Sequence, residues 1–426
     1  MEILAELLKE SAEYGVLEEN VRQGATPVNV SGMTESGKAH LAASLCKNCA
    51  LAGLYVTDSE YSAKKTAADI AFFYGENVLY YPAKEIEYYT VDAKSNEYIN
   101  ERLKVLERLV NTNENTLTVM SVDALLQFTI DFEAYVSSIM TIAAGQEYQI
   151  EELAAKLVDM GFVREEMVEG CGQFSIRGGI LDLFTPAADN PCRIEFFGDE
   201  VDSIREFDPI SQISIGQLNS VTVGAVDENF RVSGENPSVL QYISRKAVVF
   251  LDEPHRVSER AEGLAWDVSE TVKALLEKEV ITEAKERYIH DFGETLAALL
   301  ARPLVGLYSL PRSCKEYRPK ASVSLTMGAT NSFSGKLDFF YSDLHEWAGK
   351  DYRILVLAGN AAKLADLDEN LKKQDFVTAI WDEETKELAS GTVYLAEGAL
   401  RKGFYYPLIR LVIVSDEEIF GRQVKK

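Results

Sequence analysis

A glycine-rich segment near the start of the chain has the spacing of a phosphate-binding loop. Residues 32–39 read GMTESGKA and match the pattern G-x-x-x-x-G-K, with Gly32, Gly37 and Lys38 at its fixed positions. An apolar run precedes the segment, and an Ala/Leu-rich stretch typical of a helix follows it. In such a loop the backbone amides and the helix N-terminus hold phosphate, and the lysine contacts the β- or γ-phosphate. The spacing therefore predicts the geometry of a nucleotide site.

Two residues in this loop oppose nucleotide chemistry. Ala39 stands where a Ser or Thr hydroxyl normally ligates Mg²⁺. Glu35 places a negative charge inside a loop built for phosphates. We therefore expect a vestigial nucleotide site that requires no cofactor. Residual ATP binding, or a working P-loop ATPase or helicase, is the alternative.

An acidic pair follows the apolar run VVFL. Asp252 and Glu253 have the form of a DExH box, in which Asp holds the metal through water and Glu polarises the attacking water. An acidic pair at the end of a strand can equally cap the next helix. We assign this pair to the vestigial nucleotide site and expect no catalytic and no metal-binding residues in the chain.

A third candidate lies between residues 174 and 207. Because side chains alternate between the faces of a strand, the runs QFSIR and RIEFF place Arg177, Arg193 and Phe197 outward. Arginine and aromatic side chains are typical anchors of protein interfaces. The alternative is a solvated sheet face whose arginines pair with Asp182 or Glu195.

Composition narrows the possible functions. The 426 residues include 43 basic and 68 acidic ones, a net charge of −25, which opposes sequence-blind nucleic-acid binding and a polybasic membrane anchor. No run of about 18 apolar residues and no signal-peptide pattern is present, so we expect a cytoplasmic protein without membrane contact. Cys46 and Cys49 form a CxxC, but it lies in a helical stretch without a second ligand pair at zinc spacing.

The order of predicted elements divides the chain. Strands alternate with helices in 1–125 and again in 216–316, which indicates one discontinuous α/β domain with a parallel sheet. Residues 126–215 read as a strand-rich α+β insertion with 17 acidic and 5 basic residues, a net charge of −12. The Ser/Thr/Gly-rich residues 317–335 are expected to be a linker, and 336–426 a small α/β domain.

These motifs, in this order, resemble the UvrB-like half of the bacterial transcription-repair coupling factor (Mfd) family. The longest matching stretch is IRGGILDLFTPAADNPCRIEFFGDEVDSIREFD, which is similar to a signature that this family shares with the excision-repair protein UvrB. Two further stretches resemble the family: YYPAKEIEYYTVDAKSNEYINERLKVLERL and LAEGALRKGFYYPLIRLVIVSDEEIFGR. The resemblance covers nearly the whole chain and implies an N-terminal fragment of such a factor.

The resemblance carries specific expectations. It implies a degenerate RecA-like P-loop domain with an inserted α+β domain, followed by a small α/β domain. In the family the inserted domain docks on UvrA, and the contact positions fall on Arg177, Arg193 and Phe197. The implied function is to recruit UvrA and nucleotide excision repair to lesions where RNA polymerase has stalled, while the full-length protein releases the polymerase by ATP-dependent translocation on DNA. RNA polymerase and DNA would be bound only by parts beyond this chain.

Departures from the family patterns weaken the enzyme hypothesis further. Tyr88 and Tyr89 run almost directly into the next predicted helix, which leaves no room for the hairpin that UvrB threads between DNA strands. Tyr405 occupies the acidic position of a helicase motif of the form RxGxDxP, and no arginine-finger motif follows. Because losing such a finger alone lowers the rate about 10³–10⁵-fold, we expect this chain to lack ATPase activity.

Overall fold

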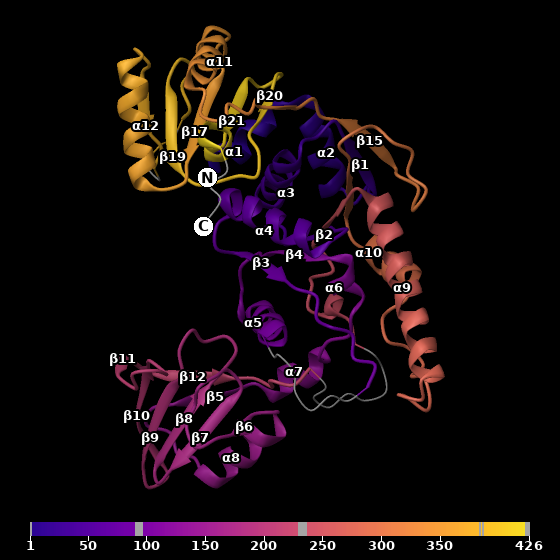
Figure 1. Ribbon diagram of the computed structural model, residues 1–426, viewed down its shortest axis with the longest axis vertical. Coiled ribbons are helices and arrows are strands. Elements are labelled where there is room, and N and C mark those ends of the chain that lie inside the picture. The colour runs from indigo at the N-terminus through magenta and orange to yellow at the C-terminus, as the bar shows by residue number, and fades with distance from the viewer. Residues whose placement is uncertain (1, 90–96, 229–236, 383–384, 386, 422–426) are drawn as a thin grey trace.

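The computed structural model describes residues 2–89, 97–228, 237–382, 385 and 387–421, and its centre is a seven-stranded parallel sheet (Figure 1). In spatial order the strands are β15 (Ala321–Ser324), β1 (Val28–Ser31), β14 (Leu304–Leu307), β13 (Val248–Asp252), β2 (Gly53–Thr57), β4 (Leu117–Ser121) and β3 (Val78–Tyr81). Residues 90–96, which follow Tyr89 and on which the expected absence of a hairpin depends, lie outside the described part. The predicted α/β class is confirmed.

The inner strands of this sheet are mostly buried because helices cover both faces. β2 and β4 are buried at every residue. The helix after β1, α3 (Glu35–Cys49), begins at Thr34, whose hydroxyl accepts a hydrogen bond from the Gly37 N–H. This N-cap fixes the start of the helix at the predicted phosphate-binding loop. The other helices around this sheet are α1 (Glu2–Leu7), α2 (Ala12–Arg22), α4 (Glu60–Tyr74), α5 (Glu97–Asn111), α6 (Val122–Leu126), α9 (Pro254–Glu277) and α10 (Phe292–Leu300).

The inserted unit lies at one end of the molecule, below the central sheet in Figure 1. Its main sheet has the order β11 (Ser214–Leu218), β10 (Glu200–Phe207), β9 (Cys192–Phe197), β8 (Ile180–Phe184), β7 (Gln173–Arg177) and β6 (Val163–Arg164), with α8 (Ile150–Asp159) beside it. β12 (Ser220–Val223) pairs with β5 (Met140–Ala143). The unit therefore continues past residue 215, where the sequence predicted its end, because 220–223 completes a strand pair with 140–143.

The last unit is a smaller mixed sheet with helices on it. Its strands follow the order β16 (Gly328–Ala329), β20 (Phe404–Tyr406), β21 (Leu411–Val414), β17 (Arg353–Ala358), β19 (Val393–Glu397) and β18 (Thr378–Ile380). Helices α11 (Leu337–Gly349) and α12 (Ala361–Lys373) contact β17, and α13 (Asp416–Phe420) follows β21. Phe340, Leu344, Leu367 and Leu371 of α11 and α12 fill the core on this side of the sheet.

Residues 317–335, predicted to be a linker, add an edge strand to each of two sheets. β15 pairs in parallel with β1, and β16 pairs antiparallel with β20. The composition of this segment favoured a connector because it has few apolar side chains. An edge strand is held by backbone hydrogen bonds on one side, so it forms without a strong apolar pattern.

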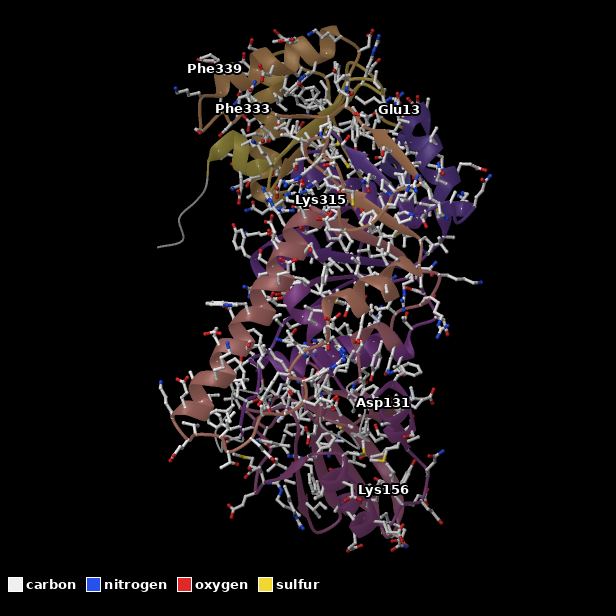
Figure 2. All side chains as sticks on the ribbon, turned by 90° about the vertical axis from the view of Figure 1, so that its right-hand side faces the viewer. Glu13, Asp131, Lys156, Lys315, Phe333 and Phe339 are labelled. Atoms are coloured by element: carbon white, nitrogen blue, oxygen red, sulfur yellow. The ribbon has the colours of Figure 1, made fainter. Side chains whose placement is uncertain are left out.

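The last unit and the central domain share one apolar core. The core residues include Leu41 and Phe73 from the central domain and Phe404 and Ile413 from the last unit. His40 is buried between them, and its Nδ1 lies 2.9 Å from the Tyr406 hydroxyl. In Figure 2 Phe333 and Phe339 of the last unit lie at one end and Lys156 of the inserted unit lies at the other. In the described part, none of the helices is both long and apolar enough to cross a lipid bilayer.

Candidate functional site

One face of the inserted sheet brings the predicted partner-binding residues together. The strand register pairs Asp182 on β8 with Arg193 on β9, and Arg193 with Arg205 on β10. Arg177, at the end of β7, reaches back to the same Asp182. We call this surface the docking face and define it by Arg177, Asp182, Arg193, Phe197 and Arg205.

A buried carboxylate organises the docking face. Asp182 Oδ2 accepts a hydrogen bond of 2.6 Å from Arg177 Nη2, and Asp182 Oδ1 accepts one of 2.7 Å from Arg193 Nε. Charge-assisted, bidentate contacts of this kind fix the planes of the guanidinium groups. The ion pairs with Asp182 that the sequence offered as an alternative are therefore present. They leave the Arg177 side chain 48% exposed.

Arg193 is held more tightly than Arg177. Its guanidinium lies 4.6 Å from the centre of the Phe207 ring, and its Nη2 donates to Asp182 Oδ2 at 2.9 Å and to Gln212 Oε1 at 3.0 Å. The hydrogen bonds to Asp182 raise the pKa of Arg193. The side chain is only 21% exposed, so its directions of contact with a partner are restricted.

Phe197 projects from the end of β9 into solvent. It is 84% exposed, and the residue after it, Gly198, has φ +67°, a left-handed conformation that suits glycine in a tight turn. The neighbouring Phe196 instead packs against the apolar core. This alternation places a large exposed ring at the end of β9, near the turn after Arg177, where the Phe196 N–H donates to the Gly179 carbonyl at 2.8 Å.

Arg205 belongs to the same face but was missed in the sequence. It ion-pairs with Glu195, its side chain is 41% exposed, and its Nε has no hydrogen-bond partner. The register between β9 and β10 shifts between Val201 and Ser203. This irregularity breaks the simple alternation by which Arg205 would have been assigned outward. The cross-strand pairing with Arg193 is the signal that places it.

The docking face concentrates positive charge within an acidic unit. Residues 126–215 contain 5 basic residues, and three of them, Arg177, Arg193 and Arg205, lie here. Two carboxylates, Asp182 and Glu195, are their direct partners. Among these five side chains the arginines exceed the carboxylates by one, and Glu200, the register partner of the exposed Phe197, adds a carboxylate at that end of the face.

The residues of the predicted vestigial nucleotide site also come together, but they bind one another. Lys38 is buried, and its Nζ lies 2.7 Å from Asp252 Oδ1 and 2.8 Å from Glu253 Oε1. Burial lowers the pKa of Lys38, but the two carboxylates raise it by more, so the amine stays charged. Glu253 Oε1 also accepts a 2.7 Å hydrogen bond from the Ser309 N–H. The lysine that would contact a phosphate is thus neutralised internally.

Residues 325–327 cover the loop, and we call them the strap. The Leu325 N–H donates to the Ser31 carbonyl at 2.9 Å, and the Met327 N–H donates to the Gly32 carbonyl at 3.2 Å. A Cβ added to Gly37 would lie 2.0 Å from the Met327 methyl group. The Met327 side chain therefore packs directly on the part of the loop where phosphate would approach.

The last unit completes the closure with an arginine. Arg401 Nε donates to Asp69 Oδ2 at 2.9 Å, and its Nη1 lies 3.0 Å from Glu35 Oε2. Ser36 Oγ accepts a hydrogen bond from the Lys402 N–H at 3.3 Å. Glu35, the acidic departure from the motif, thus pairs with an arginine of another unit. The ion pair that Glu35 forms with Arg401 therefore links the central domain to the last unit.

The described residues contain no group of three or more His, Cys, Asp or Glu side chains placed to hold a metal ion. Cys46 and Cys49 are free and buried on α3. Their packing agrees with the interpretation of the CxxC as two thiols on a helix.

Comparison with known proteins identifies the unit that carries the docking face. Residues 140–228 match the family model of the UvrB interaction domain. This part of the insertion is similar to a UvrB interaction domain. This match starts at the first residue of β5, ends five residues after β12 and includes every residue of the docking face.

The whole chain is similar to proteins named transcription-repair-coupling factor. It is 26% identical to the one from Bacillus subtilis (strain 168), with 100% of this chain and 41% of that protein covered. It is 25% identical to one from Staphylococcus epidermidis, with 100% of this chain and 40% of that protein covered. The predicted resemblance to the coupling-factor family is confirmed. The chain spans about two-fifths of the length of the curated relatives it matches.

Proposed function

We propose that this chain is the UvrA-recruiting module of a transcription-repair coupling factor. The UvrB interaction domain would bind UvrA through the docking face and so bring nucleotide excision repair to a lesion where RNA polymerase has stalled. The single observation that carries this proposal is that the buried Asp182 holds Arg177 and Arg193 on the sheet face from which the exposed Phe197 projects. Contact with the polymerase and translocation on DNA are assigned to the rest of the full-length protein.

The chemistry of the docking face suits a protein partner. Phe197 presents a large apolar ring that a pocket on UvrA would bury, and aromatic and arginine side chains are the usual centres of binding energy. The Arg177 guanidinium is held by one carboxylate oxygen and keeps free N–H groups for an acidic group on the partner. Because Asp182 fixes the guanidinium before binding, little side-chain entropy is lost when the complex forms.

We also propose that the P-loop domain is a scaffold without ATPase activity. Three arrangements support this. Lys38 is bound by Asp252 and Glu253, Met327 packs on the loop, and Ala39 offers no hydroxyl for Mg²⁺. A triphosphate would have to displace the strap and compete with two carboxylates for the lysine.

A pull-down of purified UvrA tests the recruiting function. We expect Arg177→Ala and Phe197→Ala each to weaken binding at least about 10-fold, which corresponds to the hot-spot range of about 1–4 kcal/mol. Both side chains are exposed, so circular dichroism and the thermal midpoint should stay close to those of the parent chain.

The matched control is Arg164→Ala. Arg164 is an exposed arginine of the same unit, and its register partner Phe174 points into the core, away from the docking face. We expect this variant to bind UvrA like the parent. If Arg177→Ala and Phe197→Ala together retain parental binding, the docking face is not the UvrA site.

A further inference from the structure

Three exposed isoleucines stand at the β10–β11 connection, at the far side of Arg193 from Phe197. Ile210, Ile213 and Ile215 are 93%, 68% and 55% exposed. Isoleucine is among the residues most often buried in folded proteins, and clustered exposed apolar groups mark interaction sites. We call these three residues the ledge.

The ledge is held by an ordered loop. Asp208 Oδ1 accepts hydrogen bonds from the Ile210 N–H at 3.1 Å and from the Ser211 N–H at 2.6 Å. The Asp208 N–H donates to the Ile213 carbonyl at 2.9 Å. These hydrogen bonds, first of all those from Ser211, lower the pKa of Asp208. The backbone therefore fixes the isoleucines in solvent and does not let them fold back onto the core.

A direct hydrogen bond joins the ledge to the docking face. Gln212 lies between Ile210 and Ile213, and its Oε1 accepts from Arg193 Nη2 at 3.0 Å while its Nε2 donates to the Pro209 carbonyl at 2.8 Å. Arg193 is thus bonded to Asp182 on one side and to the ledge loop on the other. This geometry makes Arg193 a positioning residue that sets the ledge relative to Arg177 and Phe197.

Arg205 lies on β10, between β9, which carries Phe197, and β11, which follows the ledge loop. Its register partners are Arg193 on β9 and Gln217 on β11. Gln217 shares the sheet face of Arg205, but the register of β10 and β11 shifts at Glu206 and Phe207, which leaves Ile215 without a partner, so strand alternation alone does not place the isoleucines. The loop that carries the ledge adjoins the docking face through the hydrogen bond between Gln212 and Arg193.

We propose that the ledge and Arg205 are a second part of the UvrA-binding surface. The occupant would be UvrA, with an acidic strip against Arg177 and Arg205 and an apolar contact against the ledge. This inference rests on the proposed function. The ledge belongs to the same matched region, 140–228, and its loop contacts the docking face through the Arg193–Gln212 hydrogen bond.

Binding to purified UvrA at two salt concentrations tests the inference with the whole chain. We expect the double variant Ile210→Ser/Ile213→Ser to bind at least about 10-fold more weakly at both salt concentrations, because an apolar contact is little affected by ionic strength. Arg205→Ala should weaken binding mainly at low salt and reduce its salt dependence. The control Val158→Ser removes an apolar side chain that is 55% exposed on α8, in the same matched region, and should bind like the parent.

The outcomes separate this inference from the proposed function. If Arg177→Ala loses binding and the isoleucine double variant does not, the ledge lies outside the interface and only the present inference is wrong. If the parent chain does not bind UvrA, the proposed function fails. If the isoleucine variant instead converts a self-associated chain into a monomer by light scattering, the ledge is a contact between copies, and the inference is overturned.

Discussion

At the scale of single residues, a few buried charged side chains fix the positions of the charged groups in the docking face and in the phosphate-binding loop. Asp182 holds two arginines of the docking face, and Lys38 is held by two carboxylates. Sequence alternation predicted the outward direction of Arg177 and Phe197 because strand geometry is local. The Arg193–Gln212 contact could not be predicted, since it joins residues 19 apart through a loop whose shape depends on Asp208.

Glu107 is a buried carboxylate with a predictable effect on stability. It lies on α5, and burial raises its pKa to about 7. The folded chain therefore binds a proton that the unfolded chain, with a pKa near the ordinary value of 4.5, has already lost. The free energy of unfolding therefore falls as pH rises from about 4.5 through 7, because the folded state must then lose the proton from a buried carboxylate.

We expect Glu107→Gln to raise the free energy of unfolding at pH 8 by about 2–3 kcal/mol and to change it little near pH 5, since each pKa unit corresponds to about 1.4 kcal/mol. Denaturant unfolding at the two pH values measures the difference. Glu101→Gln, on the exposed side of the same helix, is the control and should show no such pH dependence. An equal gain for Glu107→Gln at both pH values would contradict the assignment.

At the scale of elements, the P-loop, the end of β13 and the strap contact one another: Lys38 is paired with Asp252 and Glu253, and the strap is hydrogen-bonded to residues 31 and 32. We call this group of contacts the joint. The sequence predicted the loop and the acidic pair because their spacing is written in consecutive residues. It did not predict that Met327 packs on Gly37 or that Arg401 pairs with Glu35. These contacts join segments roughly 290 and 366 residues apart, and no local pattern records them.

The ion pairs of Lys38 predict that its replacement lowers stability, whereas in a working nucleotide site the replacement would chiefly abolish ATP turnover. Replacing Lys38 by Met leaves Asp252 and Glu253 without their cation, and we expect a loss of about 2–4 kcal/mol of stability, near the range for breaking a buried ion pair. ATP turnover should be undetectable in both the parent and the variant. Thermal unfolding and a coupled ATPase assay measure the two effects.

Lys64→Met, which removes an exposed lysine from α4, is the control and should leave the midpoint unchanged. ATP hydrolysis by the parent chain that disappears in Lys38→Met at unchanged stability would support the alternative of a working ATPase.

At the scale of the whole molecule, the last unit and the central domain are coupled through their common core. Leu41 and Phe73 pack in the same cluster as Phe404 and Ile413, and Arg401 is bonded to the buried Asp69. The sequence indicated two α/β units joined by a linker. The shared core could not be predicted, because an apolar pattern indicates that a residue is buried but does not indicate which unit it packs against.

We therefore expect β17 and β21 of the last unit to exchange their amide hydrogens at the same denaturant concentration as β1 and β14 of the central sheet. Arg401→Ala leaves Asp69 without its cation and should lower protection in both units together. Arg410→Ala, which removes an exposed pair with Asp351, is the control. Exchange of the last unit at clearly lower denaturant, with the central sheet still protected, would show that the units unfold independently.

The ion pairs of Lys38 with Asp252 and Glu253 also limit what a single substitution in this loop can change. A mutation that restored a hydroxyl at Ala39 would still leave Lys38 clasped by Asp252 and Glu253. Removing either acid would leave the amine half-compensated, and shrinking Met327 would only open an empty notch. Under the proposed scaffold role, we therefore expect that none of these single substitutions alone would free the lysine, uncover the loop and supply the hydroxyl together.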